Sequence, residues 1–282
     1  MNKVQAYIAL TRINRPVGIY LVLWPALWAL WLSSEGVPSL SVLIVFIFGA
    51  ILMRSAGCVI NDYADRNFDA HVQRTCQRPL ATGAITSKEA LGFFSLLCLM
   101  AFGLVLTLNS LTVWLSFVAV FLAILYPFMK RYTYWPQAFL GAAFAWAVPM
   151  AFAAVLNEVP WSVWLIFTVT LVWSLIYDTA YAIGDMKDDL KIGVKSTAIL
   201  FAKHLVKWIA LFQLIMLGLL LWIGQVFELG FSYYLSLLVV TIWFGYDLKR
   251  LATQSAEMAF KVFLQNHWIG LIILLGIMLD YA

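Results

Sequence analysis

The chain is built from long apolar segments separated by short polar ones. A helix needs about 20 mostly apolar residues to cross the hydrocarbon core of a bilayer. No Ser/Gly linker, charge block or low-complexity tract divides the chain into separate bodies. We therefore predict an all-α integral membrane protein, a single polytopic domain over residues 1–282, with about nine transmembrane helices at 16–33, 39–60, 90–108, 111–129, 136–156, 161–183, 205–225, 231–247 and 264–281.

Composition supports this prediction. Of the 282 residues, 64% are hydrophobic and only 11% are charged, which is not the composition of a soluble globular protein. The N-terminus is polar and the first apolar run is long enough to span, so we expect no cleaved signal peptide. The cysteines Cys58, Cys76 and Cys98 lack the spacing of a metal site.

The positive charges fall on one side of the predicted membrane. With nine spans, the N-terminus and the loops near 61–90, 130–135, 184–204 and 248–263 share a side, and every Lys and Arg lies in or close to it. The opposite loops contain Glu35, Glu158 and Glu228 but no Lys or Arg. The positive-inside rule places the basic side, with the N-terminus, in the cytoplasm. The net charge of +4 reflects this sidedness and does not indicate a nucleic-acid partner.

Two acidic motifs stand out in this apolar chain. They are NDYADRNFD at 61–69 and DTAYAIGDMKDD at 178–189, and they hold half of the 14 acidic residues. Carboxylates at or near membrane depth are costly and usually functional. Both motifs fall on the predicted cytoplasmic side, so we expect them to face each other across a cavity.

The spacing within each motif predicts a metal site. Asp65 and Asp69 are four residues apart, as are Asp185 and Asp189, so each pair shares one face if its segment is helical. We expect each pair to bind one Mg²⁺, with Asn61 as an oxygen ligand or orienting group for the first, because Mg²⁺ is bound by a few carboxylates, water and substrate phosphate. On the same helical argument, Asp62 and Asp188 point away and should tolerate substitution.

Cationic side chains accompany the acidic motifs. A diphosphate bound through Mg²⁺ requires both signs of charge, whereas a cation transporter gains little from nearby positive groups. The alternative is that these acids and bases only pair with one another at the membrane edge. Two acidic clusters of equal spacing on the same side of the membrane argue against this interpretation. The available cations are Arg12, Arg15, Arg74, Arg78, Lys130 and Arg131.

With these motifs the chain resembles the UbiA superfamily of intramembrane aromatic prenyltransferases, and within it the bacterial 4-hydroxybenzoate branch. The resemblance extends over nearly the whole chain. The NDxxDxxxD pattern is specific for the superfamily, and YPFMKR and KIGVKST point to the branch. The segments that carry it are RPVGIYLVLWPALWALW at 15–31, GCVINDYADRNFD at 57–69, RPLATGAIT at 78–86, YPFMKRYTYWPQAFLGAAFAWAVPMAF at 126–152 and YDTAYAIGDMKDDLKIGVKSTAI at 177–199.

The resemblance implies a fold and a reaction. The expected fold has nine helices around a central cavity, with a cap of cytoplasmic loops and a lateral opening to the bilayer. The expected reaction is the Mg²⁺-dependent transfer of a polyprenyl group from polyprenyl diphosphate to 4-hydroxybenzoate, at the ring carbon ortho to the hydroxyl. It would belong to ubiquinone biosynthesis at the bacterial inner membrane. The prenyl chain length, the oligomeric state and the acceptor of the ring proton stay open.

The resemblance also implies residue roles. Asn61, Asp65 and Asp69 match the first aspartate-rich motif of the family. The second motif departs from the YAMVDRDDD often found in relatives, because Met186 and Lys187 replace an Arg-Asp pair. Either Arg131 or Arg15 would bind the benzoate carboxylate. The remaining matches are Asp178, Asp185 and Asp189 in the second motif, Arg74, Arg78, Tyr126 and Lys130 around the diphosphate, and Arg131 beside them.

Three other functions are alternatives to this reaction. A sister prenyltransferase would act on dihydroxynaphthoate, homogentisate or haem, which the YPFMKRYTYWPQ and KIGVKSTAI segments disfavour. A secondary transporter would carry its charges near the midplane, whereas these acids lie at span ends. A structural membrane subunit would have no use for paired aspartate clusters.

Overall fold

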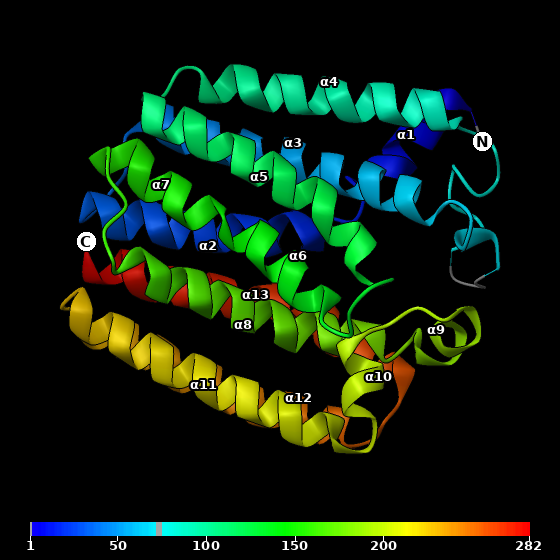
Figure 1. Ribbon diagram of the computed structural model, residues 1–282. Coiled ribbons are helices and arrows are strands. Elements are labelled where there is room, and N and C mark those ends of the chain that lie inside the picture. The colour runs from blue at the N-terminus through cyan, green and yellow to red at the C-terminus, as the bar shows by residue number, and fades with distance from the viewer. Residues whose placement is uncertain (1, 72–74) are drawn as a thin grey trace.

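The computed structural model describes residues 2–71 and 75–282, and within these ranges every regular element is a helix (Figure 1). Nine helical spans of the described chain are long and apolar enough to cross a membrane, as the sequence predicted. The helices are α1 (Lys3–Thr11), α2 (Val17–Ser34), α3 (Leu40–Asp65), η1 (Asp69–His71), α4 (Ser87–Val105), α5 (Ser110–Met129), α6 (Pro136–Ala145), α7 (Ala147–Leu156), α8 (Val163–Ala182), α9 (Met186–Ile192), α10 (Thr197–Phe201), η2 (Ala202–His204), α11 (Leu205–Val226), α12 (Phe231–Leu251) and α13 (Ala256–Asp280).

Capping residues extend two helices beyond the apolar segments that predicted them. Helix α4 begins at Ser87 because Thr86 and Glu89 form a capping box, each side chain bonding the other residue's backbone N–H. Helix α13 begins at Ala256, where Ser255 caps it, and the charged residues Glu257 and Lys261 lower the hydropathy of its first turns. Both helices therefore reach past the apolar core toward the polar membrane surface.

The fifth span is divided into α6 and α7. Proline has no N–H to donate to the carbonyl four residues earlier. Pro149 lies in the first turn of α7, and the carbonyl it leaves without a helical donor is that of Ala145, the last residue of α6. The break is therefore explained by the proline, and the two halves still form one span, Pro136–Leu156.

Helices α2 and α8 form the centre of the bundle. In each, 72% of the spanning window is buried, against 22% for α4 and 28% for α5, which lie at the outside. The rings of Trp28 on α2 and Trp173 on α8 stack with centroids 5.5 Å apart. Trp28 also donates through Nε1 to the carbonyl of Gly270 on α13 at 2.9 Å. These contacts fix α8, the helix that leads into the second acidic motif.

The two acidic motifs meet at one end of the bundle. Figure 1 shows α1, η1, α9 and α10 gathered at the end that holds the N-terminus, with the C-terminus at the opposite end. Helix α1 packs against α3 and α4 through the buried Ala6 and Leu10. It ends at Arg12, whose left-handed backbone (φ 54°) turns the chain toward α2.

Candidate active site at one end of the bundle

The first acidic motif straddles a helix end. Helix α3 stops at Asp65, and Asp69 follows in the short helix η1, after a turn closed by the bond from Phe68 N to the Asp65 carbonyl at 2.8 Å. The prediction that Asp65 and Asp69 share one face of a continuous helix is therefore wrong. Asp and Asn favour helix ends over helix interiors, and this segment is rich in both. The turn nevertheless directs both carboxylates into one cavity of about 70 Å³.

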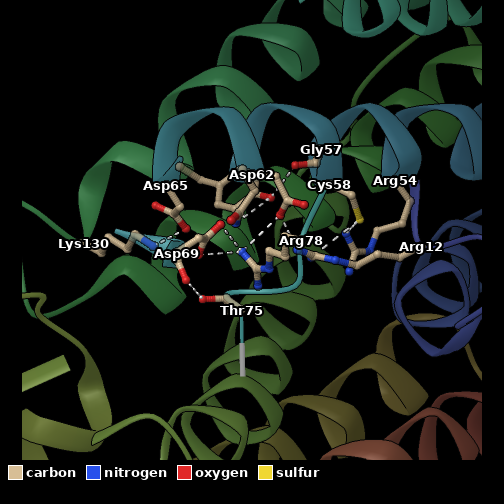
Figure 2. Close-up of polar contacts among 12 residues, drawn as sticks. Arg12, Arg54, Gly57, Cys58, Asp62, Asp65, Asp69, Thr75, Arg78 and Lys130 are labelled. Atoms are coloured by element: carbon tan, nitrogen blue, oxygen red, sulfur yellow. Dashed lines mark hydrogen bonds and ion pairs between the residues drawn. The ribbon is translucent and has the colours of Figure 1, made fainter. Parts of the chain in front are cut away.

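Two cations hold these carboxylates in place (Figure 2). Lys130 Nζ pairs with Asp65, and Arg78 Nη1 binds Asp69 through both carboxylate oxygens at 2.9 and 3.1 Å. Burial raises the pKa of Asp69, and the nearby carboxylates of Asp65 and Asp62 act in the same direction, while Arg78 opposes them. Asp69 is thus a carboxylate whose charge depends on its cationic partners.

Asp62 belongs to the same charged network. Its side chain is only 1% exposed, pairs with Arg12 and lies 3.1 Å from Arg78 Nη1 (Figure 2). The helix does turn Asp62 away from the lining of the acidic cavity, as expected, but it turns Asp62 into a buried network of ion pairs and not toward solvent. The helical argument considered α3 alone and missed Arg12, which α1 brings to the other side of the motif. Arg78 bridges Asp62 and Asp69 and so joins the two parts of the network.

The second motif reaches the cavity from α8. Helix α8 ends at Ala182. After a turn, Asp185 is the N-cap residue of α9, and Asp189 lies in the first turn of α9. Both carboxylates line the cavity that holds Asp65, Asp69, Arg78 and Lys130. Asp188 instead forms a surface pair with Lys191 at 3.0 Å, consistent with the prediction that it points away.

The donor set suits a cation that retains water and phosphate ligands. Asp65 Oδ1 is buried and accepts no hydrogen bond within the described chain, so one carboxylate oxygen facing this region lacks a partner. Among the described residues, no three His, Cys, Asp or Glu side chains are close enough to hold a metal by themselves. A carboxylate on each of two loops fits Mg²⁺ better than Zn²⁺, because Mg²⁺ usually keeps several waters and binds substrate phosphates.

The other predicted residues occupy different places. Arg131 anchors a loop, donating to the carbonyl of Ala64 and stacking over Phe68 at 5.3 Å. Arg15 is exposed between α1 and α2 and lines neither this cavity nor the one described below. Asp178 lies on α8 outside the cavity lining, and Arg74 falls outside the described residues.

An apolar cavity of about 140 Å³ is lined in part by Tyr126, one helical turn before Lys130 of the acidic cavity. Tyr126 lies at its near end, where its hydroxyl donates to the carbonyl of Gly57 at 3.1 Å and accepts from Asn61 Nδ2 at 3.5 Å. The lining comes from α2, α3, α4, α5, α6 and α7, and it is almost entirely hydrophobic. Tyr126, predicted at the diphosphate, thus lines the apolar cavity, and it is bonded to Asn61, which was predicted as an oxygen ligand or orienting group for the first Mg²⁺.

The sequence reasoning overlooked Arg54, which lines the apolar cavity from within the span of α3. Its Nη1 contacts Cys58 Sγ at 2.6 Å, and its buried Nε has no hydrogen-bond partner within the described chain. A Cβ on Gly18 of α2 would lie 2.4 Å from that Nε, so the glycine makes room for the guanidinium. The signal was present: a lone arginine inside an apolar span is itself a functional candidate.

Known proteins share this sequence and fold. Residues 22–270 match the model of the UbiA prenyltransferase family. Proteins called 4-hydroxybenzoate octaprenyltransferase are 64% identical in Hydrogenovibrio crunogenus (99% of this chain, 98% of the relative) and 54% identical in Hahella chejuensis (99% and 93%).

Solved structures agree in fold. A UbiA homologue from Aeropyrum pernix superposes with a TM-score of 0.82 at 24% identity, over 94% of this chain and 98% of the homologue. A UbiA homologue from Archaeoglobus fulgidus bound to GPP and Mg²⁺ gives 0.75 at 16% identity, over 97% and 99%. The acidic motifs, the helical bundle and these matches lead to one conclusion, that this chain belongs to the UbiA prenyltransferase family.

Proposed function

We propose that this protein transfers a polyprenyl group from polyprenyl diphosphate to 4-hydroxybenzoate, with Mg²⁺ as cofactor. The observation that carries the proposal is a pair of cavities, one lined by four carboxylates and two cations and the other apolar, whose linings come within one helical turn of each other at Lys130 and Tyr126. A diphosphate with a long isoprenoid tail has the same division into a charged head and an apolar body. The names of the full-length relatives supply the acceptor.

The charged residues bind the diphosphate head. Asp65, Asp69, Asp185 and Asp189 would hold Mg²⁺, which when bound neutralises the diphosphate and stabilises the charge that develops on it. Arg78 and Lys130, which pair with Asp69 and Asp65, line the same cavity and can turn from carboxylate to phosphate oxygens. Guanidinium and ammonium groups there stabilise the leaving group as the allylic C–O bond breaks.

The apolar cavity accommodates the tail and excludes water. Carbon–oxygen cleavage leaves positive charge on the allylic carbon, and a water-poor site limits its hydrolysis. The ring carbon ortho to the hydroxyl of 4-hydroxybenzoate forms the new C–C bond, and loss of the ring proton restores aromaticity. The products are the 3-polyprenyl acid, diphosphate and one proton, so atoms and charge balance.

Arg54 is the best candidate for the acceptor carboxylate. It is a cation at the near end of the apolar cavity, and its Nε lacks a partner within the described chain. A guanidinium presents paired donors that match a carboxylate. By contrast, Arg131 is engaged with a backbone carbonyl and aromatic rings, and Arg15 is exposed outside both cavities.

The proposal includes an orientation in the bacterial inner membrane. The end of the bundle that carries the acidic motifs also carries the Lys and Arg residues, so the positive-inside rule supports a cytoplasmic site. The donor head and the acid would then enter from the cytoplasm, while the tail stays in the bilayer.

The test is a transfer assay in membranes. Membranes containing the protein are incubated with radiolabelled 4-hydroxybenzoate, a polyprenyl diphosphate and Mg²⁺, and lipids are then extracted. We expect label in the lipid fraction that requires both donor and Mg²⁺. If dihydroxynaphthoate or homogentisate were prenylated in place of 4-hydroxybenzoate, the sister activity would be correct. If no acceptor were prenylated, the enzyme assignment would fail.

A further inference from the structure

The apolar cavity runs deep into the membrane-spanning part of the bundle. On α3 its lining extends from Gly57, near the charged site, to Val45, which is about 18 Å along the helix axis. On α5 it extends from Tyr126 to Ser116, about 15 Å. A tail that starts at the acidic cavity must therefore lie along α3 and pass its residues in order.

Small residues create the space inside this cavity. Nine alanines and glycines from six helices line it, and each leaves out a side chain that would otherwise fill the bundle. They are Ala26, Gly49, Ala50, Gly57, Ala101, Ala119, Ala123, Ala143 and Ala147.

Gly49 differs from the other small positions on α3. Val45, Gly49, Met53 and Gly57 are four residues apart and all line the cavity, so they form one stripe along the helix. A Cβ built on Gly49 would meet no heavy atom within 4 Å, whereas one on Gly57 would lie 3.6 Å from the Tyr126 hydroxyl. Gly49 thus borders open space, about 12 Å beyond Gly57 along the axis.

We propose that Gly49 determines the length of prenyl chain that the protein accepts. The missing side chain leaves the passage open to the distal isoprenoid units, and a larger residue there would close it while leaving the first units and the charged head undisturbed. The inference rests on the proposed function, because it concerns the tail of the same donor.

The test is a competition between a short and a long donor in a single reaction. Geranyl and octaprenyl diphosphate are mixed with radiolabelled 4-hydroxybenzoate, and the two prenylated products are separated. Their ratio reports relative kcat/KM and does not depend on how much protein is folded. The variants are Gly49→Ala, Gly49→Leu and Gly49→Phe. Gly103→Leu on α4 is the control, since Gly103 is exposed, lies outside the cavity lining and also has no heavy atom within 4 Å of a built Cβ.

We expect the ratio of long to short product to fall progressively from Ala to Leu to Phe. Each buried methylene contributes roughly fourfold to binding, so displacing one five-carbon isoprenoid unit should lower the ratio by up to about a thousandfold. Gly103→Leu should leave it unchanged. An unchanged ratio in Gly49→Leu and Gly49→Phe, or an equal fall in Gly103→Leu, would overturn the inference. Wild-type protein that prenylates with neither donor would refute the proposed function instead.

Discussion

At the scale of the residue, the helical pattern predicted the same behaviour for Asp62 and Asp188, whereas the structure places them in different surroundings. Both were expected to point away from the paired aspartates and to tolerate substitution. Asp62 is instead buried between Arg12 and Arg78, while Asp188 pairs with Lys191 on the surface. Asp62→Ala should leave Arg12 without its carboxylate, remove one of the two carboxylates that hold Arg78, and lower kcat by about a hundredfold or more. Asp188→Ala, its matched control, should stay within about twofold of wild type. Steady-state kinetics per folded protein measures both, and equal, small effects would contradict the network.

Gly18 provides a second residue-scale prediction. Gly18→Ala inserts a methyl group 2.4 Å from Arg54 Nε, so the guanidinium must move. We expect the KM for 4-hydroxybenzoate to rise about tenfold or more, because a carboxylate contact worth roughly 1.5–3 kcal/mol is disturbed. The KM for the prenyl donor should change little. Gly92→Ala on α4, where a Cβ meets nothing within 4 Å, is the control. A shift in the donor KM alone would refute the acceptor role of Arg54.

At this scale the sequence predicted more of the chemistry than of the geometry. The four aspartates that line the acidic cavity were all predicted from their spacing, with Arg78 and Lys130 as their cations. Arg12 was considered only as one of several nearby cations, because its contact with Asp62 spans 50 residues of chain. Arg54 could have been singled out as a lone arginine inside an apolar span, but the cavity that it lines is formed by several helices and no local pattern reveals it.

At the scale of the element, helix α8 is held by a buried polar chain. Asn266 on α13 accepts from Trp173 Nε1 at 3.1 Å and donates to Asp247 on α12 at 3.5 Å, and both Asn266 and Asp247 are fully buried. Asn266→Leu should leave two buried polar groups without this partner and lower stability by about 1–3 kcal/mol. Thermal unfolding in detergent checks this, with Asn14→Leu at an exposed position between α1 and α2 as control. Equal melting temperatures for the two variants would show that this series of buried hydrogen bonds does not stabilise the protein.

Element boundaries were predictable where hydropathy sets them and not where local polar groups do. All nine spans were found from apolar length alone. The early starts of α4 and α13 depend on caps at Thr86 and Ser255, and the end of α3 at Asp65 depends on the turn that follows. These features involve single side chains, to which a window of about 20 residues is insensitive.

At the scale of the whole molecule, orientation is the first prediction. In a background without native cysteines, Lys187→Cys lies at the end with the acidic motifs, and Val37→Cys, at a position 81% exposed, lies in the loop between α2 and α3 at the other end. In intact cells a membrane-impermeant thiol reagent should label position 37 and not position 187, following the positive-inside rule. The reverse pattern would place the site outside the cytoplasm.

The central claim is that two acidic motifs act on one diphosphate. The most direct measurement is the stoichiometry of diphosphate release to prenylated 4-hydroxybenzoate, in purified protein with Mg²⁺, for wild type, Asp65→Asn and Asp189→Asn. The account predicts one diphosphate for each prenylated product in wild type. Either substitution should reduce both products together by about a hundredfold or more, because carboxylates of both motifs line one cavity. Normal turnover after loss of either aspartate, or diphosphate release without prenyl transfer in wild type, would contradict it.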